Sequence, residues 1–212
     1  DTADTAMALM LTTLRRVVEA DMFVRVGKWN NGAFPASTSL AEKTVGICGF
    51  GRIGQAIAKR CAAFDMNVVY NSRTQKGDQP YKYYKDLKDM AENVDILVMA
   101  CPGGDDTYHI ANAAVFKALG PKGYFINIAR GSVVNTDDLL IALSNRAIAG
   151  AGLDVYETEP SVPQALISMD NVVLLPHIGG GTVEARSNMG QLVIANIKAH
   201  FNGEPLISPV AA

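Results

Sequence analysis

Three side chains in the second half of the chain have the types and spacing needed for proton transfer on a substrate that carries a carboxylate. Arg130 follows an apolar run, Glu159 lies in a short polar loop, and His177 precedes Ile178-Gly179-Gly180. An arginine can bind a carboxylate through two parallel hydrogen bonds. A glutamate paired with a histidine orients the ring and raises its pKa, so that the ring exchanges a proton near neutrality. Taken singly, each residue has a simpler interpretation: a solvated charge, a surface acid and a core histidine.

A glycine-rich turn of the form G-x-G-x-x-G stands between an apolar run and an amphipathic helical pattern. Gly49 permits a tight turn, Gly51 lets the backbone approach a pyrophosphate, and Gly54 lets the helix pack on the strand. The amides of Arg52 and Ile53 then belong to a helix N-terminus, which favours bound phosphate. Such turns also occur for packing alone, but this position between strand and helix predicts a dinucleotide site.

The end of the second predicted strand bears on which dinucleotide binds. An NAD site usually has Asp or Glu there to bond the ribose 2′-hydroxyl. This chain instead has Asn71 followed by Ser72, Arg73 and Thr74, with no carboxylate. Arg73 and two hydroxyls can bind a 2′-phosphate, which predicts NADP, with NAD as the alternative. An ordinary polar loop is the simpler interpretation.

Alternating strands and helices must position these groups. Apolar runs predict buried strands, and apolar residues at three- and four-residue steps predict helices. The predicted strands span 43–48, 67–71, 95–100, 123–129, 148–155 and 171–175. The predicted helices span 4–18, 86–93, 112–119, 136–145 and 182–201, and one more begins at 52. Residues 27–39 are predicted to form an irregular connection. The predicted fold class is α/β: a doubly wound parallel sheet of the Rossmann type with flanking N- and C-terminal helices.

Composition excludes several other classes of protein. A net charge of −2 offers no electrostatic basis for binding nucleic acid or an anionic membrane. Three cysteines without CxxC spacing, Cys48, Cys61 and Cys101, indicate reduced thiols and a cytoplasmic protein. With only three histidines, no metal site is expected.

The ordered motifs resemble one family. Gly49 to Gly54, Asn127 to Gly131, Gly152 to Glu159 with Pro160, and Pro176 to Gly179 are similar to the cofactor half of D-isomer-specific 2-hydroxyacid dehydrogenases. Further stretches resemble its NADPH-dependent glyoxylate/hydroxypyruvate reductase branch, which grades into hydroxyphenylpyruvate reductases: 71–74, 118–123 and 199–201. The resemblance implies reduction of a small 2-oxoacid to the D-2-hydroxyacid by hydride transfer from NAD(P)H. Glu159, where formate dehydrogenases of the superfamily have Gln, favours 2-oxoacid chemistry.

The resemblance also implies a role for each site residue. Arg130 would bind the substrate carboxylate and carbonyl, His177 would donate the proton, and Glu159 would hold His177. The implied cofactor contacts lie near the nicotinamide at Ile128, Ala129, Arg130, Asp154, His177, Gly179 and Gly180, and along the ribose and phosphates at Cys101, Pro102 and Thr107. The loop 101–107 departs from the family pattern, so the Thr107 contact rests on position alone.

The resemblance predicts three segments: a linking helix and connection (1–40) from a substrate domain that this chain lacks, a dinucleotide-binding domain (41–181), and a C-terminal helix and tail (182–212) that returns toward the substrate domain. The chain is then expected to be part of a longer enzyme and to bind cofactor without turning over. A homodimer is also implied, with the helix at 4–18 either at its interface or simply packed in the core. The rival function is a nucleotide-sensing binding protein, since corepressors of the superfamily keep this fold, and a non-catalytic structural domain is a third interpretation.

Overall fold

The apolar runs assemble into one sheet of seven parallel strands in the order β3-β2-β1-β4-β5-β6-β7. This computed structural model describes residues 1–210. The strands are β1 (Thr44–Cys48), β2 (Asn67–Asn71), β3 (Lys82–Tyr84), β4 (Ile96–Met99), β5 (Tyr124–Asn127), β6 (Gly150–Leu153) and β7 (Val172–Leu174). The order reverses between β1 and β4, which opens a crevice at the carboxyl ends of these two strands. The predicted doubly wound parallel sheet is confirmed.

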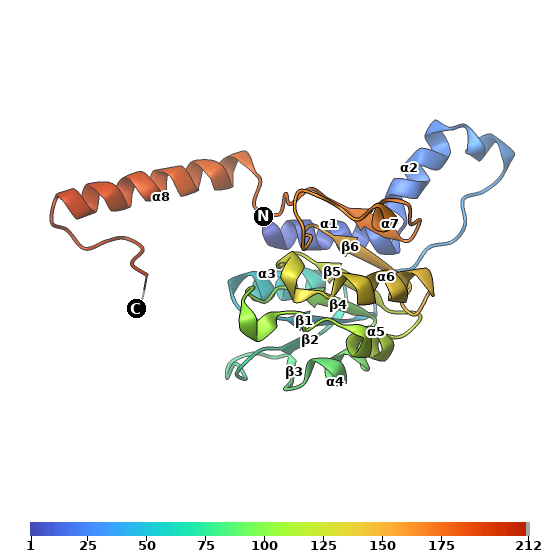
Figure 1. Ribbon diagram of the computed structural model, residues 1–212, viewed down its shortest axis with the longest axis horizontal. Coiled ribbons are helices and arrows are strands. Elements are labelled where there is room, and N and C mark those ends of the chain that lie inside the picture. Colours follow the sequence, from blue (N-terminus) through green and yellow to red (C-terminus); the bar gives the residue numbers. More distant parts are fainter. Residues whose placement is uncertain (211–212) are drawn as a thin grey trace.

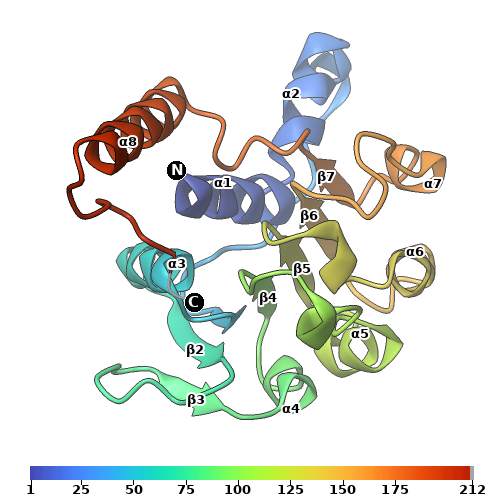
Figure 2. The same cartoon turned by 60° about the vertical axis from the view of Figure 1, so that its left-hand side comes forward.

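Helices cover both faces of the sheet (Figures 1 and 2), as the burial of every residue of β4 and β6 requires. One face carries α1 (Thr2–Leu14) and α3 (Arg52–Ala63), and the other carries α4 (Leu87–Ala91), α5 (Ala113–Leu119) and α6 (Thr136–Ser144). A four-residue helix, α7 (Gln164–Ile167), precedes β7. Each face therefore has its own apolar core.

The single helix predicted at 4–18 is wrong, because the chain forms two helices there. Arg16 has φ +53°, in the left-handed region, and separates α1 from α2 (Val17–Arg25). The arginine is held in place by hydrogen bonds to Glu19 and by its position over the Phe34 ring, 4.9 Å from the ring centroid. The apolar spacing runs on through Val17, so periodicity alone gives no sign of the break.

The two halves of the predicted helix have different surroundings. Met10 and Leu14 of α1 are buried against the sheet, so the apolar face of α1 is a core face. By contrast, α2 and the short 3₁₀ helix η1 (Lys28–Asn31) project from the body as an arm (Figure 1). We call residues 17–31 the α2 arm.

The last helix, α8 (Val183–Phe201), also extends away from the sheet (Figure 1). Within the described residues, Ala199 is its one buried side chain. The division into segments 1–40, 41–181 and 182–212 stays a prediction, and the last two residues of the third segment lie outside the described part. In residues 1–210 no helix combines the length and apolarity needed to cross a membrane.

Candidate functional site

A long groove follows the carboxyl edge of the sheet. It consists of two adjoining cavities of about 1340 and 980 Å³, which share Gly51 and residues 100–104. The larger cavity reaches Ser72, Arg73 and Thr74, and the smaller one reaches Ile128, Ala129 and Arg130. A pocket for a compact ligand usually measures about 300–1,000 Å³, so this groove suits an elongated ligand such as a dinucleotide.

The glycine turn forms the middle of the groove. Gly49 has φ +96°, and a Cβ there would lie 2.4 Å from the Cys101 nitrogen. A Cβ on Gly54 would lie 2.1 Å from the Gly49 carbonyl oxygen, whereas nothing lies within 4 Å of one on Gly51. Gly49 and Gly54 are thus required by close packing, and Gly51 faces open space. Directly after it, α3 begins at Arg52, and no side chain among residues 1–210 caps its N-terminal amides.

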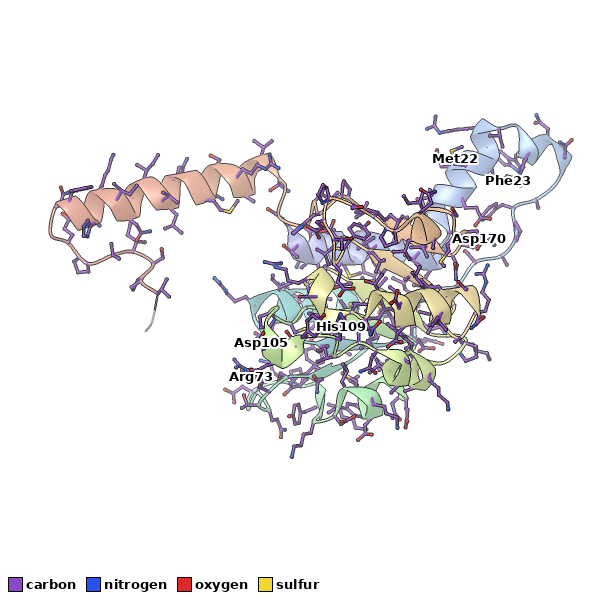
Figure 3. The ribbon with its side chains drawn as sticks, viewed as in Figure 1. Met22, Phe23, Arg73, Asp105, His109 and Asp170 are labelled. Atoms are coloured by element: carbon purple, nitrogen blue, oxygen red, sulfur yellow. The ribbon has the colours of Figure 1, made fainter. Side chains whose placement is uncertain are left out.

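Arg73 stands at one end of the groove, on an exposed turn after β2, with Asp105 at the same end of the sheet (Figure 3). The Ser72 hydroxyl donates to the Thr74 carbonyl at 2.7 Å and so shapes this turn. The Asn71 amide donates to the carbonyls of Tyr84 and Lys85 at 2.9 and 3.0 Å, so Asn71 is occupied by the fold. No carboxylate takes the place expected in an NAD site, although Asp86, Asp105 and Asp106 line other parts of the cavity.

His177 and Glu159, predicted as a pair, are brought together by the loops after β7 and β6. The His177 Nδ1 to Glu159 Oε2 distance is 2.7 Å, and Glu159 Oε1 accepts from the Tyr156 amide at 2.9 Å. Partial burial raises the pKa of Glu159, but the hydrogen bonds from His177 and Tyr156 and the charge of Arg130 outweigh it and leave this pKa below its ordinary value. The pair and Arg130 therefore form one electrostatic unit, with His177 46% exposed.

Asp154, predicted near the nicotinamide, lies behind the histidine loop. Its side chain is buried, and its two oxygens accept from the amides of Ile178 and Gly179, each at 2.8 Å. His177 has φ +54°, a strained conformation for a residue with a side chain. Asp154 anchors the loop in that conformation, and the Gly179 amide is bonded to Asp154. Neither Asp154, Gly179 nor Gly180 lines the two groove cavities.

Asn127 is a site residue that sequence reasoning missed. It is 1% exposed at the end of β5, where its amide donates to the Arg130 carbonyl and its oxygen accepts from the Ala129 amide, both at 3.0 Å. These bonds shape the turn that presents Arg130, whose Nη1 donates to the Ala129 carbonyl at 2.6 Å. The sequence does contain a signal for this residue, because Asn127 is a polar residue at the end of an otherwise apolar strand.

A second histidine–glutamate pair was also missed. His109 Nε2 lies 2.5 Å from Glu157 Oε1, and Glu157 Oε2 accepts from the Thr136 hydroxyl. Burial raises the pKa of Glu157, but the bonds from Thr136 and His109 outweigh it and lower this pKa overall. The pair ties the loop after β4, with its 3₁₀ helix η2 (Asp105–Thr107), to the loop that carries Glu159. In the same loop the Thr107 hydroxyl bonds to the Pro102 carbonyl at 2.7 Å.

Among the described residues, no group of three or more His, Cys, Asp or Glu side chains is arranged to hold a metal ion.

Comparison with known proteins identifies the family of this chain. Residues 7–179 match the model of the D-isomer specific 2-hydroxyacid dehydrogenase, NAD binding domain. Over 99% of its length the chain is 51% identical to glyoxylate/hydroxypyruvate reductase A of Arabidopsis thaliana and 50% identical to hydroxyphenylpyruvate reductase of Plectranthus scutellarioides, and it covers 67% of each.

Among solved structures, the chain superposes on the NADPH-dependent glyoxylate/hydroxypyruvate reductase of Sinorhizobium meliloti in complex with NADP and malonate. The TM-score is 0.95 and the identity is 48%, over 99% of this chain and 66% of that one. The chain thus spans about two thirds of the length of these relatives.

Proposed function

The chain belongs to the D-isomer-specific 2-hydroxyacid dehydrogenases, and from that premise we propose that the protein reduces a small 2-oxoacid to the D-2-hydroxyacid with NADPH. Glyoxylate and hydroxypyruvate are the proposed substrates. The observation that carries the proposal is the His177–Glu159 pair: the charge of Arg130 acts on Glu159, and Arg130 lines the smaller cavity of the dinucleotide-sized groove.

The proposed reaction divides among three side chains. Arg130 binds the substrate carboxylate and polarises the carbonyl. NADPH held in the groove would supply the hydride, and His177 gives a proton to the substrate carbonyl oxygen, which becomes the hydroxyl. Glu159, whose pKa lies below its ordinary value, is charged at neutral pH, so it stabilises positive charge on the ring and holds the ring's orientation.

The experiment that tests the proposal is an assay of NADPH oxidation by the whole protein and by this chain, each with glyoxylate, hydroxypyruvate and hydroxyphenylpyruvate. We expect the whole protein to turn over. This chain should bind NADPH but react far more slowly, because the pair is open to water on one side and the substrate is half-enclosed. Whole protein that binds NADPH tightly but reduces none of the oxoacids would refute the enzyme and favour a nucleotide sensor.

We further propose that NADP is preferred to NAD through Arg73. Arg73→Ala should weaken NADPH binding by at least about tenfold, the loss of one charge-assisted hydrogen bond, and leave NADH binding nearly unchanged. Calorimetric dissociation constants for both cofactors test this. Arg146→Ala is the matched control, because Arg146 pairs with Asp170 at the far end of the sheet (Figure 3). If the ratio of the NADH and NADPH dissociation constants is the same in the parent and in Arg73→Ala, the proposal is refuted.

The homodimer implied by the family is proposed to form through the α2 arm. Val18, Met22, Val24 and Trp29 are each more than half exposed there, and the arm lies away from the groove (Figures 1 and 3). We expect Met22→Glu to convert a dimer to a monomer in sedimentation. Ile141→Glu, at an apolar site on α6 that is also more than half exposed, should leave the dimer intact. A monomeric parent would contradict the proposal.

A cytoplasmic location is proposed from the cysteines. Cys48, Cys61 and Cys101 are all free and all buried. Free buried thiols are typical of proteins kept in a reducing compartment. Fractionation of source cells that places the protein in an oxidising compartment would refute this.

A further inference from the structure

Two cysteines meet on the floor of the groove. Cys48 ends β1 and pairs in register with Met99, the last residue of the neighbouring strand β4. Cys101 lies two residues beyond Met99, just past the end of β4, and both cysteines belong to one apolar cluster. The Cys48 thiol donates to the Asn71 side-chain oxygen at 3.6 Å, and each of the two cysteines alters the pKa of the other.

Both side chains line the larger cavity, so a small molecule that enters the groove can reach them. Cys101 is 8% exposed and Cys48 is 2% exposed. The third cysteine, Cys61, is fully buried in α3 against the Met7 sulfur, 3.7 Å away. Cys61 therefore serves as an internal control.

The two thiols are chemically unequal. The neighbouring Cys48 thiol lowers the pKa of Cys101, whereas the Cys101 thiol and burial raise the pKa of Cys48 well above its ordinary value. The thiolate is the reactive form of a cysteine. Cys101 is thus placed to react first, with Cys48 as the neighbouring thiol that completes the reaction.

We propose that Cys48 and Cys101 form a redox-sensitive thiol pair, which hydrogen peroxide closes to a disulfide and which thereby controls dinucleotide binding in the groove. The binding part of this inference rests on the proposed function. The Cys101 sulfur attacks peroxide, an S–O bond forms, the O–O bond breaks, and water leaves with the thiol proton. Cys48 then attacks the sulfenic acid, the S–S bond forms, the S–O bond breaks, and a second water leaves. Two thiols lose two electrons in all, and the peroxide gains them.

The bond would act on binding through the glycine turn. A disulfide holds its sulfurs about 2.05 Å apart, well inside a non-bonded contact, so Cys101 and Cys48 must approach each other. The Cys101 backbone already packs on Gly49, where a Cβ would lie 2.4 Å from its nitrogen and 2.5 Å from its Cα. Movement of Cys101 therefore displaces the turn that leads to the α3 amides. Bound cofactor should in turn shield the pair from peroxide.

The test compares reduced, peroxide-treated and re-reduced chain. Intact mass and peptide mapping score the crosslink, and calorimetry with NADPH scores binding. We expect the loss of two hydrogen atoms, a linked peptide containing Cys48 and Cys101, and binding weakened by about tenfold or more. Dithiothreitol should restore binding, and NADPH present during oxidation should slow the crosslink. The ratio of oxidised to reduced dissociation constants should stay near one in Cys48→Ser and keep the parental value in Cys61→Ser.

Three results would overturn the inference. Oxidation of Cys101 to a sulfinic acid without a crosslink would show that the thiols do not act as a pair. A crosslink with unchanged NADPH affinity, or the same loss of affinity in Cys48→Ser, would show that the pair does not control binding. If the reduced chain binds no NADPH, the cofactor assignment and the control of binding are both refuted. The formation of the disulfide is tested separately, because it is measured by mass and does not depend on NADPH binding.

Discussion

Replacement of His177 by glutamine should lower 2-oxoacid turnover by the whole enzyme by about 10²–10⁴-fold, the usual contribution of general acid catalysis. The amide keeps a hydrogen-bonding group of similar reach but cannot transfer a proton. NADPH affinity should change little, because His177 lines a separate cavity of about 260 Å³ with Glu159. Steady-state kinetics and cofactor titration measure both quantities. Near-parental turnover would remove His177 from the mechanism.

His109→Gln is the matched control for that variant. His109 also pairs with a glutamate at 2.5 Å, but its partner Glu157 is not the residue that holds His177. We expect this change to leave most turnover in place. An equal loss in both variants would mean that the effect is structural and not chemical.

Glu159→Gln should reduce turnover less and change its pH dependence. The pKa of Glu159 is lowered from 4.5, so the charged pair persists as the pH falls through 4.5 and is lost only below it. Glutamine carries no charge at any pH, so the acid-side fall in activity that protonation of Glu159 causes in the parent should be absent from the variant. Rate profiles of both proteins test this, and superimposable profiles would show that the pair does not act as a unit.

Asp154→Ala should cost about 3 kcal/mol or more of unfolding free energy, because two amides in or near the core lose charged acceptors worth about 1.5–3 kcal/mol each. The loop would also lose the anchor that holds His177 at φ +54°, so turnover of the whole enzyme should fall with stability. Urea unfolding of the chain and kinetics of the whole enzyme measure the two effects.

Two variants bracket that result. Asp154→Asn keeps one acceptor oxygen but points an NH₂ group at an amide donor, so its stability should fall between the parent and Asp154→Ala. Asp170→Ala removes an exposed aspartate paired with Arg146 and should change stability by at most about 0.5 kcal/mol. If Asp154→Ala keeps parental stability and loses only NADPH affinity, Asp154 contacts the nicotinamide and does not anchor the loop.

Much of the fold was predictable because its determinants are local. The strands β1, β4 and β5 and the turn at Gly49 can each be predicted from a few consecutive residues. A buried strand requires apolar residues, and a close approach of two backbones requires glycine. The short edge strand β3 escaped prediction. Its three residues, Lys82 to Tyr84, are held by pairing with β2 and carry little apolar pattern of their own.

The sequence by itself determined the parallel sheet, the glycine turn and the residue types of the proposed catalytic trio, because each is encoded within one strand and the loop that follows it. Only the tertiary structure decided the partnerships. Asp154 meets the amide of Ile178, His109 meets Glu157, and Cys48 meets Asn71, each pair separated by at least one intervening strand or helix. Such contacts depend on which strands lie side by side and on how each loop turns at its end. That geometry is settled by the packing of the whole sheet, and no local pattern of residues carries it.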